Sequence, residues 1–527
     1  MTRYNIVFII SIILLAACAV FLRSYRFIDT VAFRPDQASD LYIARSIVEN
    51  GNRPVVGPLL SVKHFSVPPT YYYILAGVYR FTRSPDGATV AFVIMNLLAM
   101  CCMVFLATLL MDRTAGVIMA ALFATSFIMV SESRMMWQPH PVTLCITVSL
   151  VLLFLAFQKK SIFALFISLL AYTCALSIYV SPIVLLPFYI YVSTRFFHNV
   201  YTHSCAIAVL CAIGALIVAG IPIFYHYVLY EISHALPTYT ALGTSAFRWP
   251  TIDIGIRYLG ALFDDVFANP FVQTFRSPFL SGVFETAVIG SFIMPFIRMK
   301  KYSPDIQEMV LRVRKFLASP WLFIGFLFTV FFQRDINAYR IHPFVPFIFL
   351  WFTLVIRSEL RRPSIFLLLI ALVSTMYVFD NITQIYRLLI TYDDNDVHSA
   401  ATIAFEIGRD AALKGIRHNQ MEVVAYRFDA YNNYPLFPYA YYLRDMANYS
   451  LPIVPLGNDT DRSRLDHPQT PYVYLICRST AEYSWSLDEC KNYFVEQQPS
   501  YHIVRSVASV QTATALLYKR EASLTKD

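Results

Sequence analysis

The stretch Phe33-Arg34-Pro35-Asp36-Gln37-Ala38-Ser39-Asp40 follows Asn5–Leu22, the first of many apolar runs long enough to cross a membrane. Asp36 and Asp40 are four residues apart, so in a helix they share one side and can face the same substrate atom or metal ion. Carboxylates this close to a bilayer are costly unless they are used. The alternative is that they belong to a solvated loop.

The composition indicates a membrane protein. Of 527 residues, 57% are hydrophobic and only 14% are charged, and the mean hydropathy is +0.53. These values exclude an ordinary soluble protein and predict a polytopic α-helical membrane protein.

Apolar runs that can span about 30 Å of hydrocarbon recur along the chain. They lie at Asn5–Leu22, Gly87–Met111, Ala115–Val130, Pro141–Phe157, Ile162–Val180, Ser181–Ser193, Cys205–Phe224, Phe279–Ile297, Phe316–Phe332, Pro343–Ile356 and Ile365–Phe379. We expect about eleven transmembrane helices, and up to about 13. The stretch from Ile162 must break near Ser181-Pro182 to supply two of them.

Basic residues predict the orientation. With the N-terminus in the cytoplasm, the short inside connections carry Arg3, Arg113, Lys159, Lys160, Arg195, the cluster Arg298–Lys315, Arg357, Arg361 and Arg362. The net charge of +8 then reflects topology and contact with anionic lipid headgroups, not a nucleic-acid partner. We expect a multi-pass protein of the plasma (inner) membrane.

The interesting polar residues fall in the outer connections at 23–86, 131–140, 225–278 and 333–342. The first of these contains an acidic turn, then an amphipathic helix at Tyr42–Asn50 and an aromatic helix that runs to Phe81. Two such helices can lie in the membrane interface beside a lipid-borne substrate.

Composition changes near Asp393, which divides the chain into a transmembrane domain at 1–392 and an extracytoplasmic domain at 393–527. The second domain is predicted to be a small α/β domain. We expect a helix at Ala400–Lys414, strands at Met421–Tyr426, Tyr472–Cys477, His502–Val507 and Ala513–Tyr518, and an aromatic helix at Leu436–Met446. Cys477 and Cys490 are spaced for a disulfide in an oxidising compartment, although free thiols are equally compatible with the sequence.

Four motifs resemble the GT-C glycosyltransferases of the family 39 group, which includes protein O-mannosyltransferases and aminoarabinose transferases. They are the acidic motif at 33–40 with Ala44-Arg45 and Glu49-Asn50-Gly51, Val67-Pro68-Pro69-Thr70-Tyr71-Tyr72-Tyr73, Met136-Trp137-Gln138-Pro139-His140-Pro141, and Ala338-Tyr339-Arg340-Ile341-His342-Pro343-Phe344-Val345-Pro346. Two positions depart from the common pattern. Gln37 replaces the usual Glu, and Val67 stands where many members have Lys.

The resemblance implies an inverting transfer of a sugar from a polyprenyl-phosphate donor to a glycan, lipid or protein hydroxyl, with Asp36 as general base. Asp40 would hold the acceptor, hold a metal, or tune Asp36 through like-charge repulsion. Lys63 or His64 would replace the missing lysine.

Further substrate contacts are predicted at Tyr71, Arg134 and Arg340. The arginines suit the donor phosphate because guanidinium presents a fork of donors, with interfacial anchoring as the alternative role. Tyr71 has packing as its alternative.

A divalent metal ion (Mg, Mn or Zn) would be held by Asp36, Glu132 and His140, because some relatives depend on metal. The alternative is that Glu132 and His140 are polar residues at helix ends.

Two other classes of function compete with the enzyme. A transporter or flippase of a lipid-linked glycan predicts charges near the bilayer centre and repeated broken helices, whereas these spans are nearly free of ionisable residues. A noncatalytic scaffold for the C-terminal domain would not require Asp36.

Overall fold

The computed structural model describes residues 3–27, 31, 35–58, 67–201, 204–234, 304–317, 343–360, 385–386, 397–416, 420–426, 453–456, 471–478, 491–492, 495–496, 501–510 and 513–520. The chain forms two compact units. Unit one consists of Met1–Tyr25, Gly51–Val78 and Ala88–Leu389, and unit two of Arg26–Asn50, Tyr79–Gly87 and Ile390–Asp527.

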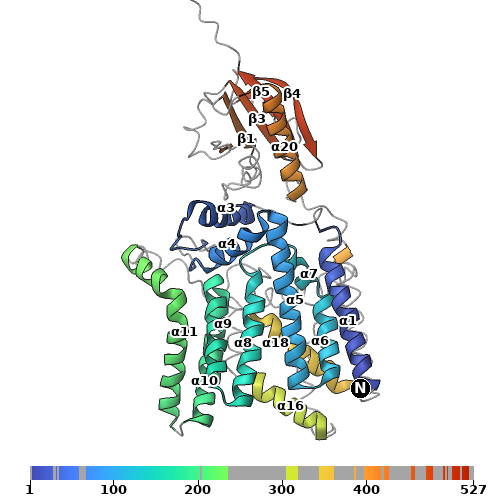
Figure 1. Cartoon of the computed structure of the whole chain (residues 1–527), viewed down its shortest axis with the longest axis vertical. Coiled ribbons are helices and arrows are strands. Elements are labelled where there is room, and N and C mark those ends of the chain that lie inside the picture. Colours follow the sequence, from blue (N-terminus) through green and yellow to red (C-terminus); the bar gives the residue numbers. More distant parts are fainter. Residues whose placement is uncertain are drawn as a thin grey trace, which may run out of the picture. The chain divides into compact units, whose positions relative to one another are not determined.

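Helices build unit one, and Figure 1 shows most of them running alongside one another. They are α1 (Arg3–Ser24), the first part of α4 (Thr70–Thr82), most of α5 (Pro85–Leu110), α6 (Arg113–Thr125), α7 (Phe127–Ser133), α8 (His140–Lys159), α9 (Ile162–Ile178), α10 (Leu186–Val200), α11 (Cys205–His234), α16 (Pro304–Leu317) and α18 (Val345–Glu359). Neighbouring helices pack pairwise, α1 against α6, α8 against α9, and α18 against α6.

Within the described part of the chain, three helices are long and apolar enough to cross a membrane unaided, namely Ile6–Ser24, Pro85–Leu110 and His140–Lys159. A fourth span results if α6 and α7 are counted together, and Ile162–Ile178, Cys205–Ile221 and Val345–Ser358 are shorter apolar helices. The spans predicted at Phe279–Ile297, Phe316–Phe332 and Ile365–Phe379 lie wholly or largely outside the described residues. The number of about eleven therefore stays a prediction.

Two helix breaks interrupt the apolar runs. The break predicted near Ser181-Pro182 is confirmed, because α9 ends at Ile178 and a 3₁₀ turn at Ser181–Leu185 leads into α10. The run Ala115–Val130, predicted as one span, is instead bent by 58° between α6 and α7. Its hinge is Ser126, whose backbone is extended (φ −66°, ψ 121°) and which ends α6 and begins α7.

Polar side chains join α8, α9 and α10 inside the apolar bundle. Ser149 and Ser168 each donate a hydrogen bond from Oγ to the other's carbonyl oxygen, both at 2.7 Å. The hydroxyl of Tyr189 then donates to Ser149 Oγ at 2.8 Å. Such bonds align neighbouring helices where lipid offers no other partner.

Unit two contains α3 (Pro35–Asn50), α20 (Val397–Leu413) and a five-stranded sheet with the order β2-β1-β3-β5-β4. The strands are β1 (Met421–Tyr426), β2 (Ile453–Leu456), β3 (Tyr472–Arg478), β4 (Tyr501–Val510) and β5 (Ala513–Arg520). Strand β1 runs parallel to β2 and β3, and β5 is antiparallel to β3 and β4.

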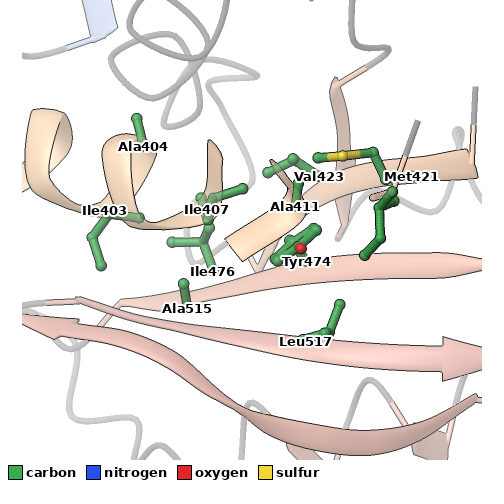
Figure 2. Packing of buried hydrophobic residues seen from close by; sticks show 11 residues of the cluster. Ile403, Ala404, Ile407, Ala411, Met421, Val423, Tyr474, Ile476, Ala515 and Leu517 are labelled. Carbon is green, nitrogen blue, oxygen red and sulfur yellow. The ribbon is translucent and has the colours of Figure 1, made fainter. Parts of the chain in front are cut away.

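The core of this sheet lies beneath α20 (Figure 2). Ile403, Ile407 and Ala411 are spaced four residues apart and so share one face of α20, which packs on Tyr474 and Ile476 of β3. The alternation of Tyr474 and Ile476 places both on the covered face of the strand.

Strand β2 was missed in the sequence because Pro455 argues against a strand. Pro455 is tolerated here because β2 is an edge strand, which has one unpaired side. The other strands and the helix lie within a few residues of their predicted bounds, whereas the helix predicted at Leu436–Met446 lies outside the described residues. Cys477 is disulfide-bonded, as the predicted pair requires, and Cys490 is not among the described residues.

Candidate functional site

Asp36 and Asp40 both lie in α3, the acidic helix at the start of unit two. The expected acidic turn before a helix at Tyr42 is wrong, because α3 already begins at Pro35. Pro35 suits the first helical position, where no backbone N–H is needed, and Asp36 in the first turn interacts favourably with the helix dipole. Asp36 is exposed, whereas Asp40, one turn later, is 5% exposed. The helix thus carries one accessible carboxylate and one buried carboxylate, one turn apart.

Glu49 links α3 to the end of α4 within unit two. Its carboxylate accepts a hydrogen bond from Arg45 Nε at 2.8 Å on its own helix and from the hydroxyl of Tyr79 in α4 at 3.3 Å. Arg83, just beyond α4, lies 3.8 Å from the same carboxylate. Each exposed pair contributes under about 1 kcal/mol, and the contacts of Tyr79 and Arg83 join α3 to the end of α4 within unit two.

The predicted donor contacts Lys63 and His64 lie outside the described residues, but the residues on either side, Gly57, Pro58 and Val67, are described, and we call them the base of this segment. The backbone N–H of Gly57 donates to the carbonyl oxygen of Val67 at 2.8 Å, and the N–H of Val67 donates to that of Pro58 at 3.1 Å. These two bonds hold the ends of the segment 59–66 together. Val67, at the position where many relatives carry Lys, is buried and closes this base.

Gly57→Ala is expected to open this base, because an added Cβ would lie 2.6 Å from the carbonyl oxygen of Val67 and closer still to that of Pro68. Overpacking of this kind costs about 1–3 kcal/mol. We expect hydrogen exchange at the amides of Gly57 and Val67 to accelerate by about tenfold or more. Gly77→Ala in α4 is the control, since nothing lies within 4 Å of its Cβ position. Equal exchange in both variants would contradict the prediction.

Tyr71 has a packing role in this structure. It is buried in α4, its ring meets Phe92 edge-on, and its hydroxyl donates to the carbonyl oxygen of Met136 at 3.2 Å. This bond ties α4 to the second outer connection within unit one. The substrate contact predicted for Tyr71 stays untested.

Arg134 is buried at the C-terminal end of α7, with 2% of its surface exposed. Its Nη1 donates to the carbonyl oxygen of Arg23 at 3.0 Å and its Nη2 to that of Tyr25 at 3.1 Å. Burial lowers the pKa of Arg134 to about 10, so the guanidinium is still a cation at neutral pH. The geometry favours a structural role at the end of α1 over the phosphate contact predicted from the sequence.

Arg23 was not identified as a site residue from the sequence, where a basic residue ending an apolar run indicates an interfacial anchor. The structure instead buries it completely. Its Nε donates to Asn96 Oδ1 at 2.9 Å, and its Nη atoms donate to the carbonyl oxygens of Phe123 and Ala124, each at 3.2 Å. No local signal predicts these contacts.

Glu132 and His140 lie near the two ends of the connection 131–140. Glu132 is buried in α7, and His140 begins α8 with its Nδ1 2.7 Å from the carbonyl oxygen of Met135. In the portion of the chain that is described, no three His, Cys, Asp or Glu side chains are grouped to hold a metal ion. The metal site predicted from Glu132, His140 and Asp36 would combine residues of both units, and it stays a prediction. Arg340 lies outside the described residues.

Comparison with known proteins identifies the fold. Residues 66–226 match the family described as dolichyl-phosphate-mannose-protein mannosyltransferase. The whole chain is similar to the crystal structure of ArnT from Cupriavidus metallidurans bound to undecaprenyl phosphate, with a TM-score of 0.57, 11% identity, and coverage of 96% of this chain and 97% of that chain. These matches confirm the resemblance drawn from the motifs, and the chain has the GT-C fold.

A second solved structure, the Archaeoglobus fulgidus oligosaccharyltransferase in complex with Zn and sulfate, matches with a TM-score of 0.47 and 12% identity. That match covers 88% of this chain and 67% of the other. No curated protein sequence matches the chain significantly.

Proposed function

We propose that this GT-C chain is an integral-membrane glycosyltransferase that moves a sugar from a polyprenyl-phosphate carrier to an acceptor hydroxyl at the outer face of the membrane. The family match at 66–226 and the likeness to ArnT over nearly the whole chain support this reaction class. ArnT was crystallised with undecaprenyl phosphate, which is itself a polyprenyl phosphate. The acceptor would be a glycan, a lipid or a protein hydroxyl.

The single observation that carries the mechanism is the placement of Asp36, exposed in the first turn of an otherwise half-buried helix. Its carboxylate would remove the acceptor hydroxyl proton as that oxygen attacks the anomeric carbon. The bond from this carbon to the phosphate oxygen breaks, and its electron pair leaves with the phosphate. A single displacement of this kind inverts the sugar configuration.

Asp40 would support this proton transfer from its buried position on α3. It lies one turn from Asp36 on the same side of α3, and its burial fixes the position of its carboxylate. It would hold the acceptor or, through repulsion between like charges, keep Asp36 ready to accept a proton.

The leaving polyprenyl phosphate carries negative charge that needs a positive partner in the transition state. Lys63, His64 and Arg340 are our candidates. Arg134 is a weaker candidate, because its Nη groups donate to carbonyl oxygens at the end of α1. A divalent ion would supply the same neutralisation, but the described residues form no site for one, and no step is assigned to it.

We expect this enzyme in the plasma (inner) membrane, with the N-terminus in the cytoplasm and residues 393–527 outside, as the basic inside connections predict. The disulfide at Cys477 is consistent with an oxidising compartment for that segment.

The test is transfer of radiolabelled sugar by the purified protein from a panel of polyprenyl-phosphate sugars to membrane lipids, glycans and proteins. We expect transfer from at least one donor. Loss of transfer with chelator, restored by one added metal, would establish metal dependence. If no donor is used while vesicles containing the protein translocate a lipid-linked glycan, the chain is a flippase instead. If neither activity is found, the result favours a noncatalytic scaffold for the C-terminal domain.

A further inference from the structure

Two buried arginines donate hydrogen bonds to carbonyl oxygens at helix ends in unit one. Arg23 closes α1 and reaches the broken span formed by α6 and α7. Its guanidinium donates to the carbonyl oxygens of Phe123 and Ala124, in the last turn of α6. The break at Ser126 frees these carbonyls from helical hydrogen bonding, and a buried carbonyl without a donor is costly.

Arg134 lies on the other side of the break and binds the end of α1. It follows α7 and donates to the carbonyl oxygens of Leu22 (3.5 Å), Arg23 (3.0 Å) and Tyr25 (3.1 Å), where α1 ends and its last carbonyls lack helical partners. We call Arg23 and Arg134 together the arginine pair. Removing either arginine leaves carbonyls of the opposite helix unsatisfied.

The buried charges are partly balanced within the same cluster. The Glu132 carboxylate in α7 interacts electrostatically with Arg23, and Asn96 in α5 accepts from its Nε. A buried guanidinium is tolerated only when it is paired and hydrogen-bonded in this way. The pair therefore joins α1, α5, α6 and α7 in a single arrangement.

The connection that follows Arg134 is held from two more sides. The carbonyl oxygen of Met136 accepts from Tyr71 in α4, and that of Met135 contacts the ring of His140 at the start of α8. The ring of Trp137 meets His140 edge-on. Arg134 supplies the contact to α1, and backbone N–H groups of Met135, Trp137 and His140 donate hydrogen bonds within the turn itself.

We propose that Arg23 and Arg134 are positioning residues, which fix the connection 131–140 and the end of α1 for sugar transfer without touching the donor. The proposal rests on the proposed function, because the two segments carry Glu132 and His140 and lead along the chain to Asp36. Small displacements of supporting segments cost large factors in rate, since reacting groups must be held in one geometry.

The test is the kinetics of Arg134→Lys and Arg23→Lys in the full-length protein. Lysine keeps the charge but cannot span two carbonyl oxygens with a planar fork. We expect kcat to fall by about tenfold or more, while KM for the donor stays within about twofold. A raised KM with unchanged kcat would instead assign Arg134 to the donor phosphate and overturn the proposal. If the folded fraction of each variant keeps the wild-type specific activity, the arginine pair has only a structural role, and the proposal is overturned as well.

Arg357→Lys is the matched control. Arg357 is a buried arginine whose Nε donates to Asp112 Oδ2 at 2.7 Å, at the other end of the 13-residue helix α6, about 20 Å along its axis from Ala124. We expect its variant to keep the wild-type kcat. An equal fall in kcat would show that loss of any buried arginine suffices and would overturn the proposal.

Two further measurements separate this proposal from the proposed function. Hydrogen exchange of the amides at 131–140 should accelerate in Arg134→Lys and not in Arg357→Lys, whether or not a donor is found. Unchanged exchange would overturn the proposal even if wild-type transfer is established. If Arg134→Lys does not fold, Tyr71→Phe removes one contact to the same connection, and the same fall in kcat is expected from it.

Discussion

Asp36→Asn is expected to reduce kcat for sugar transfer by about 10³-fold. Asparagine has nearly the same size as aspartate and can occupy the same exposed site in the first turn of α3, but it cannot accept the acceptor's proton. Donor binding should persist, because loss of a carboxylate removes no positive charge from an anionic donor. The measurement is steady-state transfer by the folded variant, with donor binding measured separately.

Asp86→Asn is the matched control for this change. Asp86 is also a carboxylate in the first turn of a helix, at the start of α5, so the same substitution tests general effects of charge and helix termini. We expect transfer close to that of the wild type. Full activity of Asp36→Asn would remove Asp36 from the mechanism, and an equal loss in Asp86→Asn would assign the effect to helix stability.

Asp410→Ala is expected to destabilise unit two by about 2 kcal/mol. Asp410 lies in α20 with 3% of its surface exposed, and its Oδ2 accepts from the hydroxyl of Tyr474 in β3 at 2.9 Å. It also pairs with Arg505 of β4 and lies 3.5 Å from Lys414 Nζ. The carboxylate therefore joins α20 to two strands, and its loss removes the hydrogen bond from the buried Tyr474 hydroxyl and both ion pairs.

The measurement is hydrogen exchange across α20 and β3 in the full-length protein, which reports the free energy of opening for these elements. Glu406→Gln is the control on the same helix, since Glu406 pairs with exposed Arg409 at 3.1 Å. Surface pairs of this kind contribute about 0–1 kcal/mol, so little change is expected. Similar exchange in the two variants would contradict the role assigned to Asp410.

Local sequence predicts the elements of this protein well where one physical signal is sufficient. The apolar runs at Gly87–Met111 and Pro141–Phe157 are helices α5 and α8, because a long apolar segment has few other stable states in a membrane. Pro182 marks a helix break because it lacks an N–H group. Alternating residues such as Tyr472, Tyr474 and Ile476 mark a strand.

The predictions from the sequence differ from the structure where the local residue type indicates one conformation and the chain adopts another. Ser126 is no helix breaker by composition, so the sequence predicts one span through it without the 58° angle at which α6 and α7 meet there. Pro455 argues against a strand, but an edge position leaves its missing N–H without consequence. Asp36 was placed in a turn, although Pro35 can begin a helix as readily as end one.

The sequence by itself determined the membrane class, the order of the helices and strands, and the acidic pair that indicates chemistry, because each depends on the periodicity or composition of neighbouring residues. Tertiary structure alone decided which buried polar groups join the helices of unit one. Arg23 meets Asn96 and Ala124 across separations of 73 and 101 residues, and Arg134 meets Arg23 across 111. No local pattern encodes such contacts, since they exist only because packing and a helix break leave buried carbonyls that need donors.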